Sequence, residues 1–393
     1  LIVVDTATFF TFKGQLVILL LFQIGGIGII SFALFFAIFL RSGVGIQSQN
    51  TLKEMLNTAS LVASRKLLKQ VIALTFLIES IGAVLLYSLM GDVIKGSDRV
   101  FYSIFHSVSA FCNAGFSLFS NGLYEEVTQD KYIMHMVIAG IIFFGSLGFP
   151  AIQDLFGIKS LRDRMKHPWK DWRLSTKVSL YSSVILVVVG AVLFYVLEHD
   201  NTIVQETSFG KVTHSIFQSI TTRTAGFNTV DFSALAVPTL VMMILLMFIG
   251  ASSASTGGGI KTSTFVVIFL SVFATIRNRR NIELAGRTLS TELLNRALTI
   301  FIFAASYIFI AVFILSITDP QIPILDTLFE TVSAFCTVGV STGVTAEFSM
   351  TGRIILMLSM YLGRVGILTL VVALSSAARQ KNYTYPQAHL MIG

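Results

Sequence analysis

The sequence predicts an all-α integral membrane protein in which one helical unit is repeated along the chain. Of the 393 residues, 54% are apolar and only 12% are charged. A soluble domain could not bury that much apolar surface, whereas a lipid bilayer accommodates it. The apolar stretches are rich in Leu, Ile, Val and Phe and lack the alternation of a lipid-facing barrel strand, so they favour helices.

Several stretches are apolar and long enough to cross the ~30 Å hydrocarbon core of a bilayer. In chain order these candidates are residues 13–40, 66–90, 132–156, 175–197, 235–276, 297–318 and 352–376. They predict a multi-pass topology. A glycine-containing segment that recurs between them predicts how they are grouped.

Three short segments share a glycine in the same context. They are Asn113, Ala114, Gly115 and Phe116; Thr224, Ala225, Gly226 and Phe227; and Thr337, Val338, Gly339 and Val340. Successive glycines, at 115, 226 and 339, are 111 and 113 residues apart. Such regular spacing predicts an internal repeat rather than scattered glycines in a single domain.

Each glycine segment follows a short apolar segment of 12 residues, at 101–112, 211–222 and 325–336. At about 1.5 Å per residue, a helix of this length covers roughly 18 Å, which is too short to cross the bilayer. We therefore expect each short helix to enter the membrane and each loop to return the chain to the same side.

The basic residues predict the orientation of the chain. They gather in two connections, at Lys159, Arg162, Arg164, Lys166, Lys170, Arg173 and Lys177 and at Arg277, Arg279, Arg280, Arg287 and Arg296. Connections enriched in Lys and Arg stay in the cytoplasm. The opposite connections carry acidic residues, namely Asp92, Asp98, Glu125, Glu126, Asp130, Glu198, Asp200 and Glu206. The glycine loops should therefore open to the outside, and the net charge of +7 reflects the inner face rather than a nucleic-acid-binding module.

The chain is expected to begin inside a fourth copy of the unit. Asp231 lies five residues beyond Gly226, and Asp5 would lie five residues beyond a glycine placed directly before Leu1. Gly25 then corresponds to Gly145, Gly250 and Gly363 on the later second spanning helices. By this count about 50 residues of the first unit precede Leu1. The predicted units are residues 1–60 (the second half of the first unit and its cytoplasmic link), 61–174, 175–291 and 292–393 (the last unit and its C-terminal tail).

Four glycine loops around one axis have the chemistry of a cation pore. A dehydrated K⁺ needs oxygen ligands in place of water, and rings of backbone carbonyls supply them. Glycine allows backbone angles that residues with a Cβ resist. Asn113, Thr224 and Thr337 add a polar group near the inner end of each loop. The short helices should direct the partly negative ends of their dipoles at the cavity, so the loops predict a K⁺ selectivity filter formed by backbone carbonyls.

At these residues the chain resembles a known family. Thr337, Val338 and Gly339 match the centre of the potassium-channel filter, and the repeated unit is similar to that of the Trk/Ktr/HKT superfamily, within which it most resembles the KtrB membrane subunits of bacterial Ktr systems. The resemblance implies four M1–pore helix–M2 repeats around one pseudo-fourfold pore, with passive, gated K⁺ transport across the bacterial plasma membrane. It also implies a homodimer with one pore per protomer, a cytosolic nucleotide-binding ring of the KtrA type as partner, and no tightly bound cofactor.

Residues 251–263 interrupt the apolar stretch 235–276 with small and polar residues, including Gly257, Gly258, Gly259 and Lys261. Irregular backbone inside a membrane must be buried in protein or line water. The resemblance implies that this segment is an intramembrane gating loop below the filter and that Arg364 faces it. A charged side chain inside the membrane is costly and usually functional. The alternative is a packing break in which Lys261 snorkels towards the surface.

The sequence contains no pattern of catalytic residues, so an enzyme is not expected. The histidines lack ligand spacing, and Cys112 and Cys336 each lie three residues before their glycine, where small buried packing residues are expected. Arg223 holds that position in the third unit, either supporting the loop through hydrogen bonds to its carbonyls or acting as a vestibule charge. Glu79 and Glu330 fall in apolar segments and are expected to pair with buried donors.

Three alternative functions stay open. Na⁺ or mixed Na⁺/K⁺ transport within the same superfamily depends on the filter residue of the first unit, which precedes Leu1. A broken-helix secondary transporter should place successive loops on opposite sides of the membrane, whereas the loops predicted here share a side. A non-conducting membrane scaffold would pass no cations in liposomes.

Overall fold

The computed structural model describes residues 3–27, 61–167, 169, 171–279 and 281–366. Predicted features on other residues lie outside the described part of the chain: the start at Leu1, Gly28, the link 41–60, Lys170, Arg280, the later portions of the candidates 13–40 and 352–376, and the C-terminal tail.

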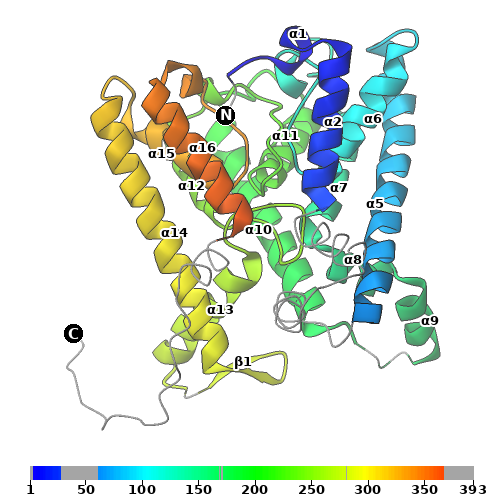
Figure 1. Cartoon of the computed structure of the whole chain (residues 1–393), viewed down its shortest axis with the longest axis vertical. Coiled ribbons are helices and arrows are strands. Elements are labelled where there is room, and N and C mark those ends of the chain that lie inside the picture. The colour runs from blue at the N-terminus through cyan, green and yellow to red at the C-terminus, as the bar shows by residue number, and fades with distance from the viewer. Residues whose placement is uncertain (1–2, 28–60, 168, 170, 280, 367–393) are drawn as a thin grey trace, which may run out of the picture.

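The described chain is built almost entirely of helices (Figure 1). In chain order these are α1 (Thr6–Phe9), α2 (Phe12–Ile27), α5 (Leu61–Leu89), α6 (Asp98–Phe111), α7 (Tyr132–Leu147), α8 (Phe149–Phe156), α9 (Ile158–Lys166), α10 (Leu174–Glu198), α11 (Ser208–Thr221), α12 (Val237–Phe248), α13 (Thr262–Ile276), α14 (Thr291–Thr318), α15 (Ile324–Phe335) and α16 (Met350–Val365). Two short strands, β1 (Ile282–Leu284) and β2 (Arg287–Leu289), form an antiparallel hairpin between α13 and α14.

Three helices of the described chain are long and apolar enough to cross a membrane, judged by length and composition. They cover Lys69–Asp92, Leu174–Glu198 and Thr291–Thr318. The helices predicted at 66–90, 175–197 and 297–318 are therefore confirmed. α12 and α13 are apolar but shorter, because an irregular segment separates them inside the predicted stretch 235–276.

The candidate span 132–156 is divided into two helices, α7 and α8. α7 and α8 form a possible fourth span of the described chain, but they meet at a bend of 105°. Gly148 lies at the bend with φ of 88°, an angle that residues with a Cβ rarely adopt. Pro150, in the first turn of α8, has no amide hydrogen to continue the hydrogen bonding of α7. The glycine that ends α16, Gly366, has the same φ of 88°.

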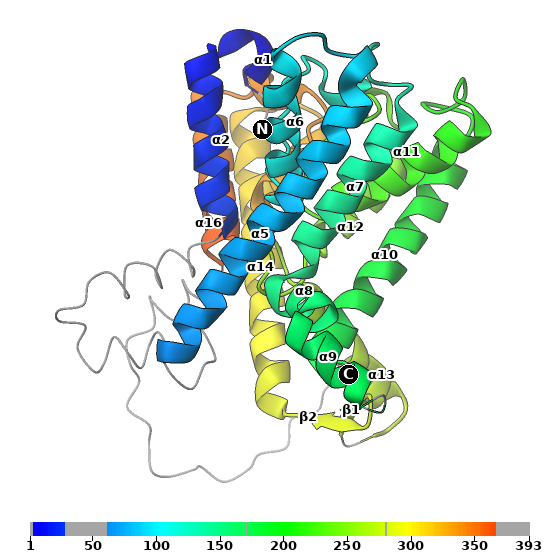
Figure 2. The same cartoon turned by 90° about the vertical axis from the view of Figure 1, so that its right-hand side faces the viewer.

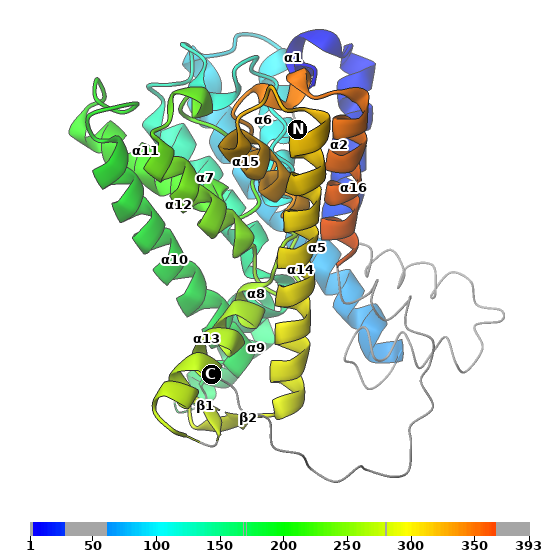
Figure 3. The ribbon, with the colours of Figure 1, turned by 90° about the vertical axis from the view of Figure 1, so that its left-hand side faces the viewer.

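The short helices predicted before the glycine loops are confirmed as α6, α11 and α15. They lie among the longer helices in the upper half of the molecule (Figures 2 and 3). Glycines on the preceding long helices allow close packing. Ser107 of α6 meets Gly82 of α5, and Ser219 of α11 meets Gly190 of α10; an added Cβ at these glycines would lie 2.4 and 2.3 Å from the serine Oγ atoms.

For the glycine loops after α11 and α15, a carboxylate joins the end of the preceding long helix to the start of the helix that follows the loop. Glu198, the last residue of α10, accepts a hydrogen bond from the backbone N of Ala236 at 3.0 Å, just before α12. Asp319, directly after α14, accepts one from the backbone N of Ser349 at 2.7 Å, just before α16. Burial opposes the charge of Asp319, but its hydrogen bonds outweigh that effect and lower the pKa of the carboxyl group.

The other end of the molecule carries α9 and the β1–β2 hairpin (Figures 1 and 2). These elements contain several of the basic residues that the sequence predicts to face the cytoplasm. No strand is predicted here from the sequence. Ala285 and Gly286 form the two-residue turn of the hairpin. Both have positive φ, 49° and 73°, as such a turn between antiparallel strands requires.

Candidate functional site

The glycines of the loops that follow α6, α11 and α15 meet at one point. A Cβ added to Gly115 would lie 2.8 Å from both the Ala225 carbonyl oxygen and the Gly226 Cα. A Cβ added to Gly226 would lie 2.5 Å from the Val338 carbonyl oxygen and 3.6 Å from the Gly339 Cα. Residues far apart in the sequence are thus brought together, with two backbone oxygens at their meeting point.

The loops share an unusual backbone conformation. Their first residue has positive φ, with 51° at Asn113, 73° at Thr224 and 54° at Thr337. φ is positive again at the glycine two residues later, with values of 74°, 83° and 97°. Glycine adopts such angles freely, whereas a β-branched threonine does so at a cost of about 1–3 kcal/mol. The surrounding structure must therefore hold the loops in place.

A hydroxyl near the end of each short helix holds the carbonyl that follows the loop glycine. The pairs are Ser109 with Phe116 at 2.8 Å, Thr221 with Phe227 at 2.6 Å, and Ser333 with Val340 at 2.6 Å. Ser333 also accepts a hydrogen bond from the backbone N of Gly339 at 3.2 Å. The carbonyls of Phe116, Phe227 and Val340 therefore face the short helix that precedes their loop. Each short helix supports its loop from behind. These hydroxyls are not among the residues predicted from the sequence.

A second support comes from a polar side chain about one turn earlier in each short helix. The pairs are His106 with Ser117 at 3.1 Å, Gln218 with Thr229 at 3.1 Å, and Glu330 with Ser341 at 2.5 Å. His106 Nδ1 lies 2.8 Å from the Tyr102 carbonyl, so Nδ1 carries the proton and Nε2 accepts from Ser117. Glu330 also accepts from Thr342 and Thr345, which confirms the expected pairing of its carboxylate with buried donors.

Arg223 does not play either role that the sequence analysis proposes for it. Its side chain is only 2% exposed, so it is not a vestibule charge. Nε, Nη1 and Nη2 have no hydrogen-bond partner among the described residues. The Thr221 hydroxyl supports this loop instead. At the corresponding positions, Cys112 and Cys336 are free and buried, as expected for packing residues.

The irregular segment between α12 and α13 forms a loop whose two ends lie side by side. Ile249 and Ile260 form an isolated parallel bridge. A Cβ on Gly250 would lie 2.5 Å from the Gly258 carbonyl oxygen. The break predicted from the small and polar residues at 251–263 is therefore present, and most of it is buried or half-buried, whereas Ser253 and Ala254 are exposed.

The glycines of this segment lie directly against the inner ends of the glycine loops. A Cβ on Gly257 would lie 2.0 Å from Thr224 Oγ1, and one on Gly258 would lie 2.2 Å from Thr337 Oγ1. Gly259 is next to Cys336, with φ of 68°. A side chain larger than hydrogen would therefore displace either the segment or the loops at these positions.

Arg364 and Lys261 both bond to backbone carbonyls of this segment. Arg364, near the end of α16, donates through Nη1 to the Thr256 carbonyl and through Nη2 to the Gly25 carbonyl of α2. Lys261 Nζ donates to the Gly257 carbonyl at 2.5 Å. The structure thus brings together the five residues that the sequence analysis assigns to gating, including both basic ones.

Glu79 of α5 is buried, with 5% of its surface exposed. Its Oε2 atom accepts a hydrogen bond from Gln23 Nε2 of α2 at 3.0 Å, so the expected pairing with a buried donor is confirmed. Cys112 Sγ lies 3.8 Å from Glu79 Oε1. These contacts join α5, α2 and the end of α6 close to the loops.

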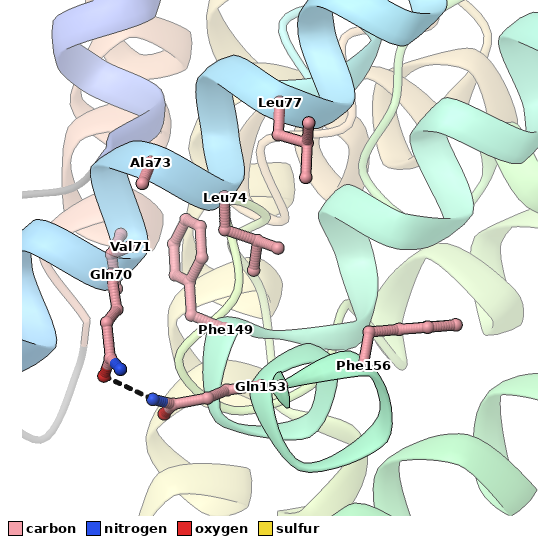
Figure 4. A pocket seen from close by; sticks show the side chains of 9 residues that line it. Gln70, Val71, Ala73, Leu74, Leu77, Phe149, Gln153 and Phe156 are labelled. Carbon is pink, nitrogen blue, oxygen red and sulfur yellow. Dashed lines mark hydrogen bonds between the residues drawn. The ribbon is translucent and has the colours of Figure 1, made fainter. Parts of the chain in front are cut away.

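A groove of about 260 Å³ lies where the bent helix pair passes α5 (Figure 4). Its lining is mainly apolar and includes Leu74, Leu77 and Phe149, while Gln70 and Gln153 hydrogen-bond to each other at one side. None of its lining residues belongs to the glycine loops or to the segment beneath them. The groove is therefore separate from the candidate site.

Comparisons with known proteins agree with these observations. The chain is 35% identical to the Ktr system potassium uptake protein B of Vibrio alginolyticus, covering 95% of this chain and 80% of that protein. It is also 35% identical to the protein of the same name from Bacillus subtilis, covering 100% of this chain and 86% of that one. The potassium/sodium uptake protein NtpJ of Enterococcus hirae is 32% identical, covering 99% of this chain and 85% of its own length.

The fold is similar to the crystal structure of the potassium transporter TrkH from Vibrio parahaemolyticus. The TM-score is 0.67 at 19% identity, and the match covers 92% of this chain and 73% of that chain. The predicted all-α integral membrane fold is confirmed. The family model named TrkH, described as a cation transport protein, matches residues 3–384, which also confirms the predicted resemblance. The chain therefore belongs to the TrkH family of cation transport proteins, whose members are ion transporters and not enzymes.

Proposed function

We propose that this chain is the K⁺-translocating membrane subunit of a gated potassium uptake system in a bacterial plasma membrane. The meeting of Gly115, Gly226 and Gly339 is the observation that carries the proposal, because it places backbone oxygens of separate loops around one point. Relatives named as potassium uptake proteins support the choice of K⁺.

In the proposed filter, hydrated K⁺ enters from outside and exchanges water for backbone carbonyl oxygens. The carbonyls of Ala225 and Val338, which point at neighbouring glycines, are the first candidates for this ring. The proposed filter residues are those named from the sequence: Asn113, Ala114, Gly115, Phe116, Thr224, Ala225, Gly226, Phe227, Thr337, Val338, Gly339 and Val340. Conduction is passive.

The proposed gate is the segment 251–263 with Arg364. Gly257 and Gly258 lie against Thr224 and Thr337 at the inner end of the proposed filter, where the segment obstructs the way to the cytoplasm. Its contacts with Arg364 and Lys261 place positive charge beside the same route, which opposes the passage of K⁺. Displacement of this segment opens the pathway.

The proposed assembly follows from the predicted four-unit organisation and from the relatives. The naming of two relatives as parts of a Ktr system supports a multi-component assembly. We propose a homodimer, one pore per protomer, on a cytosolic nucleotide-binding ring of the KtrA type. The basic inner connections are the surface offered to that ring.

Replacing Gly226 by Ser tests the proposed filter. The added Cβ meets the Val338 carbonyl and is strained at φ of 83°, so the backbone must move. Because about 1.4 kcal/mol of relative binding changes a preference tenfold, we expect the K⁺-over-Na⁺ flux ratio in proteoliposomes to fall about tenfold. Gly140→Ser is the control, since nothing lies within 4 Å of its added Cβ. An unchanged ratio for Gly226→Ser at normal protein levels would refute the filter assignment.

A mixed K⁺/Na⁺ transporter is the second candidate, and the 32% identity to the potassium/sodium uptake protein NtpJ favours it. The same proteoliposomes distinguish the two functions. Comparable K⁺ and Na⁺ fluxes through the unaltered protein would replace the first proposal by the second.

A further inference from the structure

Glu79 and Arg364 both hydrogen-bond to the same turn of α2. Gln23, in this turn, donates to Glu79 Oε2 at 3.0 Å. Two residues later, the Gly25 carbonyl accepts from Arg364 Nη2. Gly26 packs against the end of α6, where an added Cβ would lie 2.4 Å from Cys112 Sγ. The turn is therefore in contact with α5, with the end of α6 and with α16.

The contacts continue from this turn to the irregular segment. Arg364 Nη1 donates to the Thr256 carbonyl. The Thr256 hydroxyl in turn lies 3.1 Å from the Gly145 carbonyl of α7 and 3.2 Å from the Phe111 carbonyl of α6. A line of hydrogen bonds thus connects α5, α2, α16 and the segment 251–263, and it ends on α6 and α7, which pack against α5.

We infer that Glu79 is a positioning residue for the gate, acting through Gln23. By holding Gln23, Glu79 fixes the turn of α2 that receives Arg364, and it thereby stabilises the arrangement in which the segment lies beneath the loops. An ionisable side chain in a spanning helix is costly unless it has a specific partner, and Glu79 is 5% exposed with Gln23 as its amide donor. The inference rests on the proposed gating role of Arg364 and the segment.

The test measures basal K⁺ flux through the purified full chain in liposomes without any cytosolic partner. Arg364→Ala should raise basal flux, because the segment loses its bond to α16. Glu79→Gln should raise it about two- to tenfold, because the neutral amide oxygen of Gln accepts a weaker hydrogen bond from Gln23 than the Glu79 carboxylate does. If Glu79→Gln is poorly produced, Gln23→Leu removes the same contact at a half-buried position. Glu198→Gln is the control, since this buried carboxylate bonds within another part of the chain and should leave basal flux unchanged.

Two combinations separate a positioning role from a merely structural one. Adding Glu79→Gln to Arg364→Ala should give little further increase, because both changes interrupt one line of contacts. Exchanging the two partners, Gln23→Glu with Glu79→Gln, restores an amide donor opposite a carboxylate and should return basal flux towards that of the unaltered chain.

The outcomes distinguish this inference from the proposed function. If Arg364→Ala leaves basal flux unchanged, the gate assignment and the inference both fail. If Arg364→Ala raises flux but neither Glu79→Gln nor Gln23→Leu does, the gate stands and the inference is overturned. Full additivity of Glu79→Gln and Arg364→Ala, or an exchanged pair that behaves like Glu79→Gln alone, also overturns it.

Discussion

Thr224 and Thr337 adopt positive φ, although β-branched residues disfavour it. Their conformation is therefore imposed by contacts and not by local preference. Asn113, at the same place in its loop, tolerates positive φ more readily and donates to Thr224 Oγ1 at 3.3 Å. The sequence predicted the special backbone of the glycines, because glycine is the usual residue for it. It could not predict the threonine angles, which depend on supports behind the loop.

Ser333 offers a direct test of these supports. Replacing it by Ala removes the donor to the Val340 carbonyl and the acceptor for the Gly339 amide. Losing such hydrogen bonds costs about 1 kcal/mol each, so the loop should relax and its K⁺-over-Na⁺ flux ratio should fall several-fold. Ser316→Ala is the matched control, because that hydroxyl donates to a carbonyl of its own helix. Equal ratios for the two variants would show that Ser333 does not determine the loop geometry.

The supporting hydroxyls are difficult to recognise in a sequence. A serine or threonine inside a helix commonly donates to a carbonyl of the preceding turn, as Thr331 does to Thr327 at 2.7 Å. Ser333, two residues further on, instead reaches the loop. Only the path of the chain after the helix distinguishes the two, so residue type and position alone do not reveal the support.

Breaks in the helices are as informative as the helices themselves. The composition of residues 251–263 predicted the break between α12 and α13, because polar residues interrupt an apolar stretch. The bend between α7 and α8 was harder to predict, since Gly145 and Gly148 also suit close helix packing. Both breaks meet in the structure, where Ser252 N donates to the Ser146 carbonyl at 3.0 Å and Phe149 N donates to the Ala254 carbonyl at 3.1 Å.

Shortening the irregular segment tests whether it obstructs the pathway. Deleting residues 255–259 removes Gly257 and Gly258 from their places against Thr224 and Thr337. We expect basal K⁺ flux in proteoliposomes to rise about tenfold, the factor for roughly 1.4 kcal/mol removed from the closed arrangement.

An equal deletion in the hairpin, residues 282–286, is the control for loss of chain length far from the loops. It should leave basal flux unchanged. A reduced or unaltered flux after deletion of 255–259, with normal protein levels, would contradict the gating role of the segment.

Across the whole molecule, composition and the length of the apolar stretches predicted the class of fold, which is confirmed, whereas the grouping of the helices into four units stays a prediction. They did not predict the hairpin, because Ala285 lacks the preference for positive φ that marks such turns in a sequence. Nor did they predict the carboxylates that join distant helices. Glu198 and Ala236 are well separated in the sequence, and their contact depends on how α10 and α12 pack.

Glu198 should contribute to stability without affecting transport. It is fully buried and accepts hydrogen bonds from Asn201, Thr202, Ala236 and Thr239. Glu198→Gln replaces one accepting oxygen by an NH₂ group, which cannot accept hydrogen bonds from these donors. We therefore expect the free energy of unfolding to fall by about 1–3 kcal/mol, measured by thermal unfolding in detergent. Glu283→Gln is the control, since its ion pair with Arg279 is exposed and contributes at most about 1 kcal/mol. Similar unfolding temperatures for the two variants would rule out this role.

The three side chains behind the loops, His106, Gln218 and Glu330, differ in chemistry although they occupy similar places. In a pore made of four identical subunits, one substitution behind a loop would be present behind all four loops at once. Because the loops here belong to a single chain, the residues behind one loop can change while those behind the other loops stay the same. Selection, or an experimenter, can therefore adjust the proposed filter one loop at a time, and the effect of one altered loop can be measured against unaltered loops in the same molecule.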